Sequence, residues 1–174
     1  MNLLKSRKIL FPVAIVIVVG AVFILRTWWF AGNNTGYAPE QPFPFSHKKH
    51  AGDNQIPCMY CHSNADNSKH ATIPPMQVCM NCHRVVKTDS PLIQQVTEMY
   101  NSGKAFEWVK VHDLPDFVYF SHKRHILKGF ACAECHGDVA SMVRIKQVKP
   151  LTMGFCINCH RANKGPQDCY TCHH

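Results

Sequence analysis

One five-residue motif, Cys-x-x-Cys-His, occurs five times in this chain and uses all ten of its cysteines. Two thiols one helical turn apart, followed directly by a histidine, are what covalent attachment of a c-type haem requires. The thiols that would bond to the porphyrin vinyl groups are Cys58, Cys61, Cys79, Cys82, Cys132, Cys135, Cys156, Cys159, Cys169 and Cys172. The histidines that would be proximal iron ligands are His62, His83, His136, His160 and His173. The sequence therefore predicts five c-type haems.

Zinc sites and disulfide bonds are the other common uses of paired cysteines. The interval from Cys61 to Cys79 falls inside the range of zinc ribbons, and that from Cys135 to Cys156 is close to it. A four-cysteine site, however, needs no histidine after each pair, and five pairs cannot be divided evenly into such sites. A Cys-x-x-Cys pair is a redox motif rather than a structural bridge, and that chemistry needs one pair, not five. The motifs therefore favour haem attachment.

The N-terminus carries an uncharged apolar run from Ile9 to Leu25, preceded by Lys5, Arg7 and Lys8. Its 17 residues are at the short end for a transmembrane helix and slightly long for the core of a signal peptide. The basic residues place the N-terminus in the cytoplasm by the positive-inside rule. We predict a retained single-pass anchor in a bacterial inner membrane, with the rest of the chain in the periplasm, and keep a cleaved signal as the alternative.

The chain divides into an anchor, a linker and a haem-binding domain. Residues 1–30 are predicted to be the cytoplasmic tip and transmembrane helix, residues 31–44 a linker, and residues 45–174 a periplasmic pentahaem domain. About 130 residues are too few to surround five haems with a core of side chains. The porphyrins would therefore form most of the core. We expect a mostly irregular and α-helical fold with little regular secondary structure.

The formal net charge of +8 at pH 7 raises the question of a polyanionic partner. The propionate groups of five haems would offset most of this charge. We therefore interpret the lysines and arginines as counter-ions of the cofactors and predict no nucleic-acid binding.

An internal repeat organises the haem-binding domain. Residues 45–84 and 120–161 each open with Phe-Ser-His-x-x-His and each contain two of the five motifs. Residues 85–119 form an insert without a motif, in which a helix is predicted to start at Pro91. Residues 162–174 carry the fifth motif. The haems are thus predicted to be grouped as two, two and one.

A haem that only transfers electrons has both axial positions of its iron filled. Of the 12 histidines, seven lie outside the motifs, and two His-x-x-His pairs open the repeats. Residues three apart share a helix face. We predict His47 as the distal ligand of the first haem and His122 as that of the third, with His50 and His125 crossing to other haems.

The fifth distal ligand is left open by the sequence. His112 and Met142 are the leading candidates, and His70 comes after them. Methionine would raise the potential of that haem relative to the bis-histidine haems, although Met142 is equally well explained as a residue packing on porphyrin. His174 directly follows His173 and is predicted to lie in a disordered terminus.

The repeated blocks resemble the class III multihaem cytochrome c superfamily. The run from Leu114 to His125, the motif at Cys132 and the run from Leu151 to Arg161 also resemble the pentahaem subunit of alternative complex III. That resemblance implies a subunit without an active site of its own. Its partners would be iron–sulfur and polytopic quinol-binding subunits and a monohaem cytochrome c. It would relay electrons from quinol toward a periplasmic cytochrome c or a terminal oxidase.

Two other functions compete with a pure relay. A self-contained, membrane-anchored quinol dehydrogenase that feeds a periplasmic nitrate or nitrite reductase also has an N-terminal anchor and several haems. A catalytic multihaem enzyme needs an open axial position, often marked by lysine in place of the motif histidine. All five motifs here end in histidine, so we predict an electron-transfer subunit rather than an enzyme.

Overall fold

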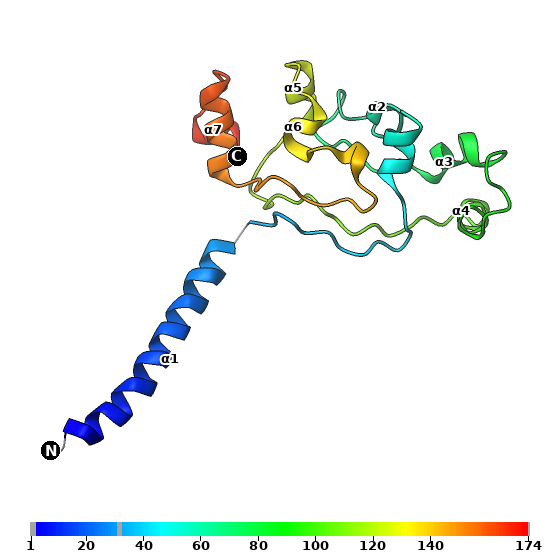
Figure 1. Ribbon diagram of the computed structural model, residues 1–174. Coiled ribbons are helices and arrows are strands. Elements are labelled where there is room, and N and C mark those ends of the chain that lie inside the picture. Colours follow the sequence, from blue (N-terminus) through cyan, green and yellow to red (C-terminus); the bar gives the residue numbers. More distant parts are fainter. Residues whose placement is uncertain (1–2, 31–32, 174) are drawn as a thin grey trace. The chain divides into compact units, whose positions relative to one another are not determined.

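The computed structural model describes residues 3–30 and 33–173 and is built from short helices joined by long irregular segments (Figure 1). No strand occurs within these ranges. The helices are α1 (Leu3–Phe30), η1 (Lys48–Asp53, a π-helix), α2 (Cys58–Cys61), α3 (Met76–His83), α4 (Pro91–Asn101), α5 (His122–Leu127), α6 (Cys132–His136), η2 (Val139–Ser141), α7 (Met153–Ala162) and η3 (Cys169–Thr171). The predicted fold class, mostly irregular and helical with one apolar N-terminal helix, is confirmed.

The N-terminal unit, residues 1–34, is dominated by helix α1. Its 28 residues make a helix about 42 Å long at 1.5 Å per residue. The stretch Leu10–Trp28 has a mean hydropathy of 2.5 and none of it is buried. By length and composition it can cross a membrane, and the apolar core of a signal sequence has the same character.

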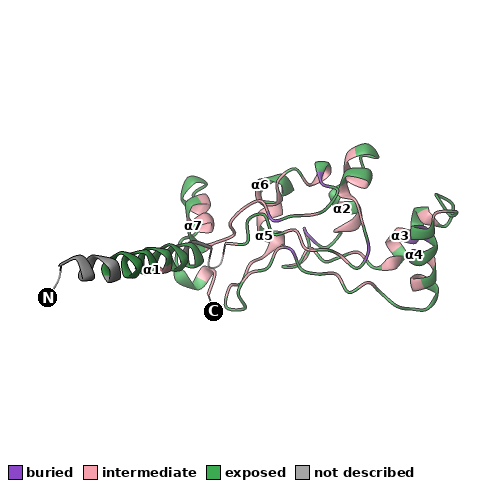
Figure 2. Cartoon of the chain, turned by 60° about the horizontal axis from the view of Figure 1, so that its bottom comes forward, coloured by how far each residue is buried: buried purple, intermediate pink, exposed green. Residues whose placement is uncertain are grey.

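The second unit, residues 35–174, holds all five motifs. Figures 1 and 2 show the motif-bearing helices spread along this unit, with α3 and α4 at one end, α2 next, then α6 with α5, and α7 at the other end. Irregular segments run between them. Residues 35–44 belong to this unit, because the amide of Gly36 donates to the carbonyl of Gln147 and the amide of Gln147 donates to that of Tyr37.

Very few side chains are buried (Figure 2). Among residues 10–28 and 33–173, those that are buried are Phe43, Ala65, Met80, Ile93, Val96, Val111, Met142 and the polar Gln147. Folded domains of this size normally bury well over half of the surface of the unfolded chain. The polypeptide therefore has little core of its own, which is what a domain built around large flat cofactors requires.

A small hydrophobic cluster joins α3 and α4. Phe43, Met80 and Val96 form its buried centre, and Phe106 and Trp108 pack against them. The rings of Phe43 and Phe106 stack with centroids 4.7 Å apart, a favourable offset for aromatic pairs. The cluster fixes the motif-free insert against the helix that carries the second motif.

Helix α4 forms where the sequence predicts it. Ser90 is its N-cap residue, and Pro91 occupies the first turn, where its missing N–H costs nothing. Ile93 and Val96 are buried on one face. The helix ends at Asn101, and Gly103 takes a left-handed φ of +68° just beyond it.

Gly137, directly after the third motif, offers a test of close packing. Its φ is +71°, and a Cβ placed on it would lie 2.5 Å from Cγ2 of Val148. Gly103 has a similar φ of +68° but no atom within 4 Å of a Cβ. An alanine at either position is strained by the positive φ, but only the alanine at position 137 is also overpacked. We therefore expect Gly137→Ala to lower the free energy of unfolding by about 1–3 kcal/mol more than Gly103→Ala does. Guanidinium unfolding of the two holoproteins measures this difference, and equal midpoints would contradict it.

Candidate haem-attachment sites

In four of the five motifs both cysteines lie within one α-helix (α2, α3, α6 and α7) and so share one helix face, and the fifth motif begins in the 3-10 turn η3 with Cys172 directly after it. All ten cysteines are free thiols, and each is half-buried or exposed. Burial raises the pKa of several of them, including Cys79 and Cys156. Neutral, accessible thiols paired on one helix face are the donor set that thioether formation requires.

Four of the five motif histidines are oriented by backbone carbonyl groups. A carbonyl oxygen can only accept, so Nδ1 must carry the proton and donate. The remaining ring nitrogen, Nε2, then keeps a free lone pair for a metal. The donor–acceptor pairs are His62 to Thr72 (2.7 Å), His83 to Val86 (3.1 Å), His173 to Phe117 (3.0 Å) and His160 to Pro166.

The two His-x-x-His blocks have the same local geometry. The Phe45 ring meets His47 edge-on at 5.0 Å and stacks on His50 at 4.4 Å. The Phe120 ring meets its own two histidines at 4.8 and 4.5 Å in the same orientations. Nδ1 of the second histidine donates to a serine carbonyl in each block, at 2.9 and 2.8 Å. The sequence repeat is thus a structural repeat of the histidine arrangement.

Three histidines of these blocks face a motif histidine at one characteristic separation. The ring centroids are 6.1 Å apart for His50 and His83, 6.3 Å for His122 and His136, and 6.0 Å for His125 and His160.

That separation has a simple origin in metal coordination. A metal–imidazole bond is about 2 Å long. Adding about 1 Å from each nitrogen to its ring centre places two imidazoles on opposite sides of one metal about 6 Å apart. The residues present therefore fit c-type haems with two axial histidines.

His47 and His136 are half-buried. Desolvation lowers the pKa of each to about 4, and neighbouring histidines add to the effect. Among the neighbouring histidines, His62 lowers the pKa of His47 the most. Both imidazoles are therefore neutral at pH 7, which is the form that binds a metal.

The remaining candidate ligands lie in different surroundings. The ring of His112 is 4.4 Å from that of His136, which is too close for both to bind one metal from opposite sides, and its Nε2 is buried without a hydrogen-bond partner. Met142 is buried, and its carbonyl accepts from the amide of Lys48, beside His47. His70 is exposed. His174 lies outside the described residues.

Sequence reasoning missed the groups that orient the histidines. Thr72, Val86, Phe117 and Pro166 act through their carbonyl oxygens, and a carbonyl is present in every residue type. Lys69 is the most distant example, since its carbonyl accepts from Nδ1 of His122 at 2.9 Å across 53 positions of the chain. No residue-type signal could have identified them.

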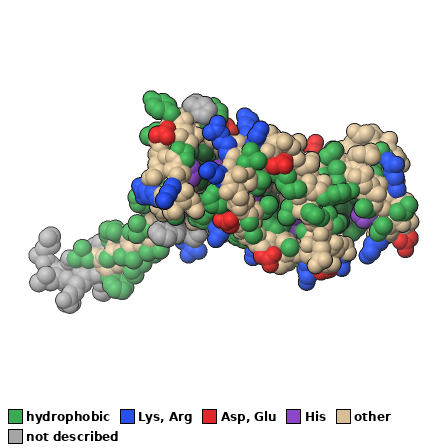
Figure 3. All heavy atoms as spheres, turned by 90° about the horizontal axis from the view of Figure 1, so that it is seen from above, with side chains coloured by type: hydrophobic (Ala, Val, Ile, Leu, Met, Phe, Trp, Pro, Cys, Tyr) green, Lys and Arg blue, Asp and Glu red, His purple; other side chains and the backbone are tan. Residues whose placement is uncertain are grey.

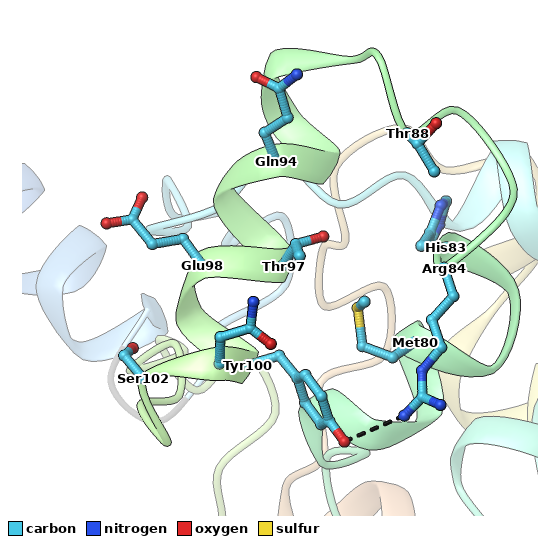
Figure 4. A pocket seen from close by; sticks show the side chains of 10 residues that line it. Met80, His83, Arg84, Thr88, Gln94, Thr97, Glu98, Tyr100 and Ser102 are labelled. Atoms are coloured by element: carbon cyan, nitrogen blue, oxygen red, sulfur yellow. Dashed lines mark hydrogen bonds between the residues drawn. The ribbon is translucent and has the colours of Figure 1, made fainter.

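A cavity of about 890 Å³ lies between α3 and α4 (Figure 4). His83, Met80 and Arg84 line it from one side, and α4 contributes mainly polar side chains from the other. Arg84 donates to the Tyr100 hydroxyl at 3.2 Å, and that hydroxyl donates to Gln77 at 2.6 Å. Because His83 is a motif histidine, the cavity is part of the second attachment site.

On the face shown in Figure 3, the charged side chains do not gather into one patch. In Figure 3, lysine and arginine side chains alternate with acidic and hydrophobic ones, and histidines appear at several separate places on the face shown. This distribution agrees with several cofactor sites along the unit rather than one active site.

Comparison with known proteins agrees with this geometry. Residues 118–174, which contain the third, fourth and fifth motifs, match the family described as cytochrome c7 and related cytochrome c. The chain is also 38% identical over 120 residues to the menaquinone reductase multiheme cytochrome c subunit of Nitratidesulfovibrio vulgaris (strain Hildenborough). That match covers 68% of this chain and 56% of the relative, so the chain spans little more than half the relative's length. Residues 118–174 thus belong to the cytochrome c7-related family, and the chain is related to multihaem cytochromes c.

Proposed function

We propose that the chain carries five c-type haems and is the electron-relay subunit of a membrane-bound, quinone-linked respiratory complex. The observation that carries the proposal is the set of three histidine pairs at 6.0–6.3 Å, each joining a block histidine to a motif histidine. When bound, the haems would supply reversible one-electron transfer. Filled axial positions leave no place for a substrate, which favours a relay over an enzyme.

The chain's own residues have three tasks in this proposal. The ten motif cysteines hold the cofactors, and the five motif histidines are the proximal ligands. The distal ligands are His47 for the first site, His50 for the second, His122 for the third and His125 for the fourth. The fifth distal position is proposed for His112 or Met142, both of which are largely buried.

The parent complex is inferred from the relative and from the sequence resemblance. The relative is named as a subunit of a menaquinone reductase, which favours a complex linked to the quinone pool. The resemblance to alternative complex III favours the same kind of assembly, with iron–sulfur and polytopic quinone-binding subunits and a monohaem cytochrome c as partners. The two differ in direction, because the first delivers electrons to quinone and the second takes them from quinol.

Three measurements test the proposal. Pyridine haemochrome analysis of the purified protein should give five covalent haems per chain, and electron paramagnetic resonance of the ferric protein should show low-spin signals only. A high-spin signal in the unmodified protein would indicate an open axial position and would favour a catalytic haem. Isolation from native membranes in mild detergent should bring down polytopic and iron–sulfur subunits.

Assays of the purified chain distinguish a relay from a self-contained quinol dehydrogenase. The isolated chain should exchange electrons with small redox mediators but should not oxidise a quinol analogue, because the proposal places the quinone site on a partner. Useful quinol oxidation by the chain alone would contradict it. The direction of electron flow is read from the intact complex, by supplying either reduced cytochrome with quinone or quinol with oxidised cytochrome.

The N-terminal helix is proposed to be a retained anchor. The 19-residue stretch Leu10–Trp28 has the hydropathy of a membrane span, so the full chain should remain in the membrane pellet after alkaline carbonate extraction. A variant whose first 30 residues are replaced by a cleavable signal peptide should appear in the soluble periplasmic fraction with its haems attached. A mature protein whose N-terminus begins after α1 would show instead that the helix is a signal sequence.

A further inference from the structure

The two repeats touch through their first motifs rather than end to end. Their order in the chain would place the second motif next to the third. The contacts between the two repeats instead join the first motif to the third.

The second motif lies beside the first. Nδ2 of Asn81, inside the second motif, donates to the hydroxyl of Tyr60, inside the first, at 3.0 Å. His50 faces His83 of the second motif, and His47, the proposed distal ligand of the first site, lies three residues before it at the start of helix η1. The first and second attachment sites are therefore neighbours.

The segment that follows the first motif holds the helix that serves the third. The carbonyl of Lys69 accepts from both the amide (3.1 Å) and Nδ1 (2.9 Å) of His122, and the carbonyl of Ser68 accepts from the amide of Lys123 at 3.0 Å. His122 in turn faces His136 of the third motif.

A second junction joins the same two repeats. Helix η1, which follows His47, packs on η2, which follows the third motif. The approach is so close that a Cβ on Gly52 would collide with the carbonyl oxygen of Ala140. The first and third sites are therefore neighbours.

The fourth and fifth motifs continue the line on the far side of the third. Helix α5 presents His122 to the third motif and His125 to the fourth, so these two sites share one helix. The carbonyl of Pro166, in the short connection to the fifth motif, accepts from His160 of the fourth. In Figures 1 and 2 the helices accordingly run from α3 through α2 and α6 to α7.

We propose that the five attachment sites form one line in the order second, first, third, fourth, fifth, with the second and fifth motifs at its ends. Electrons are then exchanged with partner proteins at these two ends, beside the α3–α4 insert and beside the C-terminal motif. The inference rests on the proposed function, since it requires haem at all five motifs. The two repeats contact each other through their first motifs, so the order of the motifs in the chain differs from their order in space.

Proton NMR of the fully reduced holoprotein tests the order, because neighbouring haems give nuclear Overhauser contacts between their substituents. His47→Met marks the first haem and His50→Met, three residues away, marks the second. A bound methionine shifts its own methyl signal strongly, and an unbound one leaves a high-spin iron, so either result identifies the haem. The first haem should show two neighbours and the second only one. Contacts from the second haem to two others, or from the first to one alone, would overturn the order.

A measurement on the unmodified holoprotein keeps the test independent of the variants. A short lysine-reactive cross-linker should join Lys69 to Lys123, because the two residues lie at the junction of the repeats and are both exposed. Absence of that cross-link, with other lysines modified normally, would overturn the first-to-third junction. A haemochrome count below five would contradict the proposed function, whereas five haems with a different contact order would contradict this inference alone.

Discussion

Replacing Cys132 and Cys135 together by alanine is expected to abolish folding of the haem-binding unit as well as attachment of the third haem. The polypeptide buries few side chains of its own, so each cofactor supplies apolar surface that nothing else provides. The third motif also lies in the middle of the unit, against the first repeat and against α5. We expect fewer than four haems per chain by haemochrome analysis, and loss of a cooperative thermal transition.

The matched control is the pair Cys169→Ala and Cys172→Ala in the fifth motif. This motif lies in a short C-terminal turn, η3, at one end of the line of helices. The control should lose one haem, keep the other four and retain a cooperative transition at lower temperature. If the Cys132/Cys135 variant also kept four haems and a cooperative transition, the view that the cofactors form the core would be wrong.

Replacing His125 by methionine is expected to raise the reduction potential of one haem. The ring of His125 lies beside that of His160, with the centroids 6.0 Å apart, and methionine is a weaker donor that favours ferrous iron. Axial ligands set haem potentials over about 0.8 V, and we expect a shift on the order of 100 mV. Spectroelectrochemical titration should show one component of the curve moved to higher potential, with the others close to their original positions.

Lys123→Met is the control for this substitution, because Lys123 is exposed and lies on the same helix α5. Its titration curve should overlay that of the unmodified protein. An unchanged curve for His125→Met, together with a low-spin spectrum, would show that another residue fills this axial position. The assignment of His125 to the fourth haem would then fail.

The cofactor class and the fold class followed from local sequence. The spacing Cys-x-x-Cys-His is a property of five consecutive residues, and a short helix brings its members to one face without help from the rest of the chain. The scarcity of residues per haem likewise implied an irregular, helical polypeptide without a conventional core, and the structure has few buried residues in the described ranges.

The His-x-x-His blocks could also be recognised in the sequence, since each forms one local segment with a stacked phenylalanine. The sequence alone did not show which motif histidine each block histidine faces. His50 and His83 are separated by 33 positions, and their 6.1 Å separation depends on how the intervening chain folds back.

The sequence by itself determined the class of cofactor and the number of Cys-x-x-Cys-His motifs, because both depend on chemistry within five consecutive residues. Only the tertiary structure decided how the histidines are oriented and which sites are neighbours. The orienting groups are backbone carbonyls such as that of Lys69, which no residue type marks. The joining of the two repeats through their first motifs likewise depends on long-range contacts, such as Gly52 against Ala140, that a local pattern cannot encode.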